Sequence, residues 1–118
     1  MNYTFDNERP IYLQIVDIIT NEIISGELSP GSKILSVREY AMVLKANPNT
    51  VVKALSILED NKLIVTERTN GKFVTTDLEI IKKYKENLFF DKVSSFIKEI
   101  EGMGFTKEEV IKKLMEDK

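Results

Sequence analysis

Two amphipathic helices with almost no chain between them constrain this sequence more than any other feature. The first begins in 36-SVRE-39, where the Ser36 hydroxyl and the Glu39 carboxylate can each accept a backbone N–H from the other residue, forming a capping box. The second begins at Asn47, a good N-cap residue, with Pro48 at the first helical position. Only Ala46 and Asn47 lie between them, so we expect a steep crossing, as in a helix-turn-helix. Apolar residues at three- and four-residue spacing give each helix a core stripe: Val37, Tyr40, Ala41 and Leu44 in the first, and Val51, Ala54, Leu55 and Leu58 in the second.

The outward face of the second helix has an unusual composition. It carries short hydrogen-bonding groups and one cation, with no acid among them: Asn49, Thr50, Lys53 and Ser56. Solvated helix faces usually mix Lys with Glu, and Lys53 has no Glu four residues away on either side. Asn49 and Thr50 stand at a helix start, where free backbone N–H groups make an anion site. We therefore expect this face to contact a partner.

A β-hairpin is expected directly after these helices. The runs 63-LIVTER-68 and 72-KFVTT-76 are apolar and β-branched, and 69-TNG-71 between them holds the Asn-Gly pair typical of hairpin turns. An earlier helix starts at Pro10 and carries a stripe through Ile15, Ile19 and Ile23. Three helices followed by such a wing predict a winged helix-turn-helix in residues 1–76.

The pattern changes at residue 77. A long apolar stripe predicts one helix from Leu78 to about Ile100, bent near Phe89 if at all, and TKEE at Thr106 is a second capping box that opens a short helix. The long helix carries more apolar surface than a small domain can cover, so we expect residues 77–118 to be a dimerisation and regulatory tail. The predicted fold is therefore mainly α with a small β-hairpin (α+β): a winged helix-turn-helix followed by a short two-helix tail.

Charge is distributed unevenly along the chain. The 118 residues have a net charge of −2, but residues 31–76 hold seven bases and four acids, a net of +3. The basic part of an acidic chain thus coincides with the helix-turn-helix and the hairpin, which favours double-stranded DNA as a partner.

Composition argues against several other classes. The absence of Cys and His removes disulfides, thiolate nucleophiles, Cys/His zinc sites and imidazole catalysis. There is no Gly-rich phosphate loop and no carboxylate pair in a recognisable acid–base setting, so we expect no enzyme, cofactor or metal site. No apolar run reaches the roughly 20 residues that span a bilayer, and no signal peptide is evident. We expect a cytoplasmic protein without membrane contact.

The ordered motifs of residues 26–74 resemble a known family. G-x-L-x-P-G-x-K, S-V-R-E, N-P-N-T-V-x-K-A and x-L-E-x-x-x-L-I, read in sequence, are similar to the DNA-binding domain of GntR-family bacterial transcription regulators. The stretch 10-PIYLQI-15 and the short two-helix tail resemble the YtrA subfamily. The resemblance implies a homodimer on an inverted-repeat operator, usually a repressor released by a small-molecule effector, which is unidentified here. It also implies control of ABC-transporter genes.

The resemblance assigns DNA contacts to particular residues. Arg38 occupies the place of an arginine that reaches DNA from the first helix of the pair. The start of the second helix of the pair, at Asn47, lies in the major groove, and the wing tip approaches the minor groove. The implied DNA-binding residues are Arg38, Asn47, Asn49, Thr50, Lys53, Arg68, Asn70, Gly71 and Lys72.

The sequence departs from the family pattern at four places. Leu35 replaces a proline, Asn61-Lys62 replaces a common glycine, Thr69 replaces a wing glycine, and Val52 stands where a polar residue is common. Because Thr69 removes one glycine, the wing tip is less able to approach a DNA backbone closely. An exposed Val52 would suit contact with thymine methyl groups.

Plainer interpretations stay open. Arg38 could pair with a neighbouring carboxylate, Asn47 could be only a cap, Lys53 could be only solvated, and Arg68 and Lys72 could serve to blunt a sheet edge. The aromatic residues of the tail are read as core and dimer interface rather than as a ligand site. The rival function is a winged-helix adaptor that binds protein and not DNA, which the acidic total charge favours and the acid-free helix face disfavours.

Overall fold

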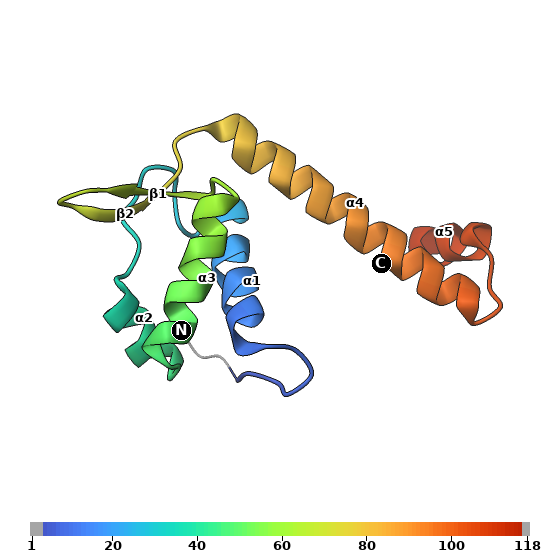
Figure 1. The fold of residues 1–118 in the computed structure, drawn as a ribbon. Coiled ribbons are helices and arrows are strands. Elements are labelled where there is room, and N and C mark those ends of the chain that lie inside the picture. Colours follow the sequence, from blue (N-terminus) through green and yellow to red (C-terminus); the bar gives the residue numbers. More distant parts are fainter. Residues whose placement is uncertain (1–3, 117–118) are drawn as a thin grey trace. The chain divides into compact units, whose positions relative to one another are not determined.

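The computed structural model describes residues 4–116, which form two compact units that divide between Lys82 and Lys83. The first unit, here called the head, contains helices α1 (Ile11–Ile24), α2 (Val37–Leu44) and α3 (Pro48–Asp60), and strands β1 (Ile64–Glu67) and β2 (Gly71–Val74) (Figure 1). Helix α4 (Leu78–Gly102) begins in the head and continues into the second unit, which ends with α5 (Lys107–Glu116). The predicted mainly helical fold with one small hairpin is confirmed.

Helix α3 is the centre of the head. It packs against α1, α2 and β1, and Figure 1 shows α1 and α2 beside it. The stripes expected in α1 and α3 are buried, and that of α2 is buried at Tyr40 and Leu44 and half-buried at Val37 and Ala41, because each stripe faces this shared core. The largest fully buried side chains are Ile15, Ile19, Ile23, Tyr40, Val51, Leu55, Leu58, Leu63, Ile64 and Val74. Each buried aliphatic side chain of this size contributes about 1.5–3 kcal/mol to folding.

Both ends of α2 are fixed by local chemistry. Ser36 Oγ accepts from the Glu39 N–H at 3.1 Å, and Glu39 Oε1 accepts from the Ser36 N–H at 2.9 Å, which confirms the predicted capping box. Helix α2 ends at Lys45, which adopts a left-handed conformation at φ 53°. Its end is closed further by Ala46, whose N–H donates to the Ala41 carbonyl at 3.0 Å. The turn between the two helices is therefore short and closed, as the sequence predicted.

The wing is an antiparallel pair in which Ile64 faces Val74 and Glu67 faces Gly71. Its outer end is a turn closed by the Asn70 N–H on the Glu67 carbonyl at 3.2 Å, and Gly71 follows at φ 105°, where a side chain would be strained. A short extended piece at Lys33 lies along β2 and forms an isolated bridge to Phe73. The Ile34 N–H donates to the Lys72 carbonyl at 3.0 Å, so β2 has partners on both sides.

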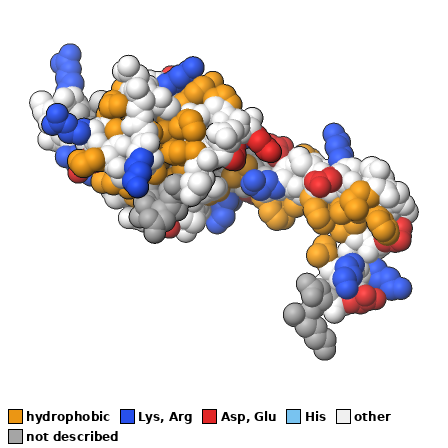
Figure 2. Space-filling view, turned by 90° about the horizontal axis from the view of Figure 1, so that it is seen from below, with side chains coloured by type: hydrophobic (Ala, Val, Ile, Leu, Met, Phe, Trp, Pro, Cys, Tyr) orange, Lys and Arg blue, Asp and Glu red, His pale blue; other side chains and the backbone are white. Residues whose placement is uncertain are grey.

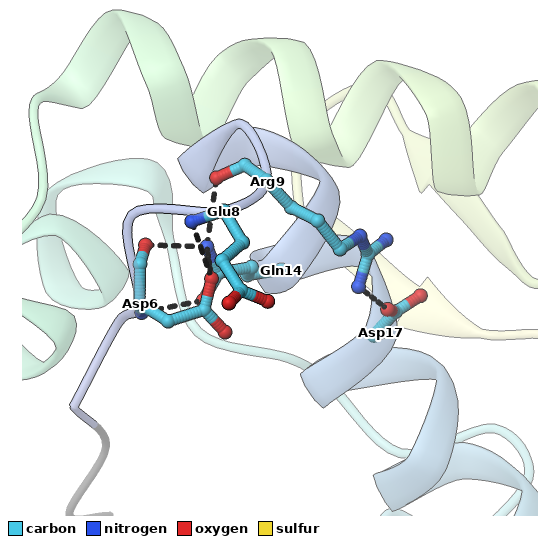
Figure 3. A network of polar contacts seen from close by, with 5 residues as sticks. All are labelled: Asp6, Glu8, Arg9, Gln14 and Asp17. Carbon is cyan, nitrogen blue, oxygen red and sulfur yellow. Dashed lines mark hydrogen bonds and ion pairs between the residues drawn. The ribbon is translucent and has the colours of Figure 1, made fainter.

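The segment before α1 is held by one glutamine (Figure 3). Gln14 Oε1 accepts the Asp6 N–H at 3.1 Å, and Gln14 Nε2 donates to the carbonyls of Asp6 and Arg9 at 3.0 and 2.9 Å. Arg9 also forms an exposed ion pair with Asp17 at 2.7 Å. Helix α1 has no side-chain N-cap. The Gln14 amide fixes the chain that enters the helix, but it bonds none of the N–H groups of the first helical turn.

The second unit buries few of its side chains. Helix α4 contains no buried residue, and only Val110 is buried in α5. The predicted capping box is present: the Thr106 N–H donates to Glu109 Oε1 at 2.9 Å, and the Glu109 N–H donates to Thr106 Oγ1 at 3.1 Å. Helix α4 runs unbroken through Phe89 and Phe90. Among the described residues, no helix is long and apolar enough to cross a membrane.

Candidate nucleic-acid interface

The outward face of α3 is exposed as the sequence predicted. Asn49, Val52, Lys53 and Ser56 are exposed, whereas Thr50 is half-buried. Val52 is 49% exposed, although it is apolar and lies between core positions. The face therefore offers an amide, a hydroxyl, a cation and one methyl-bearing side chain, all of which suit base edges and phosphates.

The prediction that free backbone N–H groups at the start of α3 form an anion site is wrong. Pro48 has no N–H, and Asn47 Oδ1 accepts the Asn49 N–H at 2.8 Å. The N–H groups of Thr50 and Val51 both donate to the Asn47 carbonyl, at 2.9 and 3.1 Å. A helix binds an anion through N–H groups that lack partners, and here the first turn has none. Any contact from this end must come from side chains.

Lys53 has a specific neighbour that the sequence did not indicate. Its ammonium nitrogen lies 3.9 Å from the ring centroid of Tyr12 on α1. A cation over an aromatic face is attracted by about 0.5–1 kcal/mol at an exposed site. Tyr12 thus favours one position of the Lys53 side chain on the α3 face.

Arg38 lies exposed in the first turn of α2. Within residues 4–116 it forms no ion pair, so the plainer interpretation of Arg38 as a partner for a neighbouring carboxylate finds no support. Its guanidinium remains available for a bidentate contact.

The predicted wing residues divide into two groups. Arg68, Asn70 and Gly71 are exposed at the turn. Asn70 Nδ2 lies 3.4 Å from Glu67 Oε2, a long contact, and a side chain at Gly71 would meet Lys33 at 3.1 Å. These residues form the tip that sequence reasoning placed there. In the space-filling view, Lys and Arg side chains project from the outer edge of the head (Figure 2).

Lys72 behaves differently, because its charge is already engaged. Its ammonium lies 2.6 Å from Glu59 Oε1 at the end of α3, and it donates to Thr66 Oγ1 at 2.8 Å. Thr66 in turn donates to Glu59 Oε2 at 2.6 Å. The hydrogen bond from Lys72, then that from Thr66, lowers the pKa of Glu59 below its usual value.

Sequence reasoning missed Tyr12, Glu59 and Thr66 as partners of site residues. Thr66 and Lys72 are opposite in the hairpin register, so that pair could have been found from the turn position. The contacts of Tyr12 with Lys53 and of Glu59 with Lys72 join different elements, and no spacing along the chain signals them. Among the described residues, no group of acids is placed to hold a metal ion.

Comparison with known proteins agrees with this geometry. The family model described as "Bacterial regulatory proteins, gntR family" matches residues 11–74. The YhcF protein of Bacillus subtilis, an uncharacterised HTH-type transcriptional regulator, is 38% identical over 94% of this chain and 92% of its own length. The chain belongs to the GntR family. It is a transcriptional regulator with the family's DNA-binding domain, and not an enzyme.

Other known proteins resemble the chain, and two of them do so beyond the matched domain. The HTH-type transcriptional repressor YtrA of B. subtilis is 34% identical, with 77% of this chain and 84% of YtrA aligned. A GntR family transcriptional regulator from Listeria monocytogenes has a TM-score of 0.90 at 37% identity, covering 97% of this chain and all of that one. The DNA-binding domain of AraR, solved in complex with operator ORE1, has a TM-score of 0.55 at 25% identity, covering 64% and 94% of the two chains. The predicted likeness to YtrA-type GntR regulators is confirmed.

Proposed function

We propose that this GntR protein is a sequence-specific repressor that binds an inverted-repeat operator as a homodimer. The observation that carries the proposal is the exposed, acid-free face of α3 beside an Arg38 that has no carboxylate partner among the described residues. In this proposal residues 1–76 bind DNA and residues 77–118 dimerise. The operator-bound AraR domain and the repressor YtrA support the proposal by similarity.

Each contact has a distinct role in this proposal. Asn49, Val52 and Lys53 face base edges or phosphates of the major groove. At the helix start, Thr50 contributes its hydroxyl and Asn47 its side-chain NH₂ group, because Asn47 Oδ1 already accepts the Asn49 N–H. Arg38 holds a phosphate from α2. Arg68, Asn70 and Gly71 bring the wing tip to the minor groove. Each neutralised phosphate contributes about −0.9 to the slope of log affinity against log salt, so a single head binds weakly.

A second head is the natural source of stronger binding, and the second unit offers the surface to recruit it. Its exposed apolar side chains include Phe89, Phe90, Val93, Met103, Ile111, Leu114 and Met115. Apolar side chains also line a groove between α4 and α5: Phe96, Ile100, Phe105, Val110 and Leu114. We propose that a second copy covers this surface and that an unidentified effector acts there by changing the spacing of the heads. On family resemblance, the regulated genes include those of an ABC transporter.

The decisive experiment is selection of random duplex DNA on the purified protein at moderate salt. Arg38→Ala is run in parallel, with Lys98→Ala in α4 as a control that also removes one surface cation. We expect an inverted repeat that the wild type and Lys98→Ala enrich and Arg38→Ala does not. Failure of the wild type to enrich any sequence would contradict the proposal and favour the protein-binding adaptor.

A further inference from the structure

One carboxylate, that of Glu59, connects helix α3 to both strands of the wing. Glu59 stands one residue before the end of α3. Its two oxygens accept from different strands: Oε1 from Lys72 of β2 and Oε2 from Thr66 of β1, each at 2.6 Å. Lys72 also donates to Thr66 at 2.8 Å, which closes a three-membered ring of polar contacts. We call these three residues the wing clamp.

The wing clamp lies where the hairpin has little other attachment to the helix. At the base of the wing, Ile64 and Val74 are buried in the core of the head. The other three residues of β1 are exposed, and Val65 is 45% exposed. Thr66 and Lys72 form the register pair two positions further out than Ile64 and Val74. The clamp thus holds the outer half of the wing, which the hydrophobic core does not reach.

The side-chain charges within the clamp balance. Glu59 and Lys72 have side chains 35% and 26% exposed, so each keeps partial contact with water. If Lys72 moved to a phosphate, Glu59 would be left as an unpaired carboxylate close to a polyanion. That arrangement is unfavourable, because it separates an ion pair and sets like charges near each other. Arg68 at the turn has no such engagement: within the described residues it forms no ion pair.

We propose that Glu59 is a positioning residue that fixes the wing on α3, and that Lys72 serves DNA binding as its counter-ion rather than as a phosphate contact. The direct cationic contact of the wing then belongs to Arg68. This inference rests on the proposed DNA-binding function for its second half only. The orientation of the wing relative to α3 is a property of the free protein and is testable without DNA.

The first test measures amide hydrogen exchange of the full chain without DNA. Glu59→Gln removes the charge that Lys72 and Thr66 share, and Asp60→Asn removes an adjacent exposed charge as a matched control. We expect exchange of the residue 64–74 amides to rise about tenfold in Glu59→Gln, the loss expected of a charge-assisted hydrogen bond. Exchange of α1 amides should stay at the wild-type rate in both variants. Unchanged wing exchange in Glu59→Gln would overturn the positioning role, whether or not the protein binds DNA.

The second test measures how affinity for the selected duplex depends on salt. The key protein is the double variant Glu59→Gln/Lys72→Met, which removes the pair without changing net charge. We expect it to bind several-fold more weakly than wild type with an unchanged salt slope, whereas Arg68→Met should flatten the slope by about 0.9 per head. Flattening by about 0.9 per head in the double variant would show that Lys72 contacts phosphate and would overturn the counter-ion role.

The two tests separate failure of this inference from failure of the proposed function. If the wild type bound no duplex in the selection, the DNA-binding proposal would fail, together with the counter-ion role of Lys72. The exchange experiment would still decide whether Glu59 positions the wing.

Discussion

At the residue scale, Glu22 on α1 is the most buried acidic side chain among the described residues. It is 5% exposed, and its Oε1 has no hydrogen-bond partner among the described residues. Burial first, and then the nearby Glu27, raises the pKa of Glu22 to about 7. Tyr40 is similarly buried, and burial followed by the charge of Glu22 raises its pKa to about 12. Both effects follow from placing ionisable groups in an apolar core.

The raised pKa makes the stability of the head depend on pH. The folded head favours the protonated form of Glu22. Its contribution to the free energy of unfolding is therefore complete below the unfolded pKa near 4.5 and is lost as pH rises through about 7. With 1.36 kcal/mol for each pKa unit, the loss by pH 8 is on the order of 3 kcal/mol. We expect Glu22→Gln to abolish this fall, as measured by urea unfolding at pH 5 and pH 8. Glu27→Gln should keep most of it, and equal pH dependence in wild type and Glu22→Gln would contradict the assignment.

Lys53 gives a second prediction at this scale. If it neutralises a phosphate, Lys53→Ala should weaken binding evenly across operator variants and flatten the salt slope by about 0.9 per head. Tyr12→Leu removes the aromatic face 3.9 Å away while keeping an apolar side chain. It should weaken binding roughly two- to fivefold without changing the slope, because it alters only the position of Lys53. A loss in Lys53→Ala that is confined to one base position would instead show base reading.

At the element scale, each helix of the helix-turn-helix begins at a side-chain cap. Ser36 and Glu39 cap α2 reciprocally, and Asn47 caps α3. Short helices gain little from propensity alone, so such caps decide where they start.

Removing the α2 cap should therefore have a measurable cost. We expect Ser36→Ala to lower the free energy of unfolding by about 1 kcal/mol, measured by urea denaturation. Ser56→Ala on the exposed face of α3 is the matched control and should cost less than about 0.5 kcal/mol. Equal losses in the two variants would argue against the capping box.

The same elements show what could be read from the sequence. The helix starts, the core stripes and the wing strands follow from local rules of capping and periodicity, and the structure agrees with them. The unusable N–H groups at the start of α3 were missed because the Asn47 carbonyl accepts two of them, a local geometry that residue types do not specify. The wing clamp was missed because Glu59 meets Lys72 only after the hairpin folds back on the helix.

At the scale of the whole molecule, the second unit exposes large apolar side chains to solvent. Phe89 and Phe90 are 72% and 68% exposed on α4, and large exposed apolar patches mark interaction surfaces. The proposed answer is a second copy of the chain.

We expect the full chain to sediment as a dimer and Phe89→Glu/Phe90→Glu to sediment as a monomer, because four carboxylates would then meet in the interface. Met42→Glu, at a residue of α2 that is 71% exposed, makes the same kind of change on the head and should leave the dimer intact. A dimeric Phe89→Glu/Phe90→Glu variant would place the contact elsewhere. The same monomer should also lose affinity for the inverted repeat.

The organisation of α3 has a consequence for how this regulator could diversify. Its backbone N–H groups at the start are satisfied within the helix, and Val51, Ala54, Leu55 and Leu58 alone face the core. The side chains at positions 49, 52, 53 and 56 support no buried packing. With the DNA-reading role proposed for this face, grafting the corresponding four side chains of another regulator should transfer its operator preference to this scaffold, at a cost in folding limited to the Lys53–Tyr12 contact.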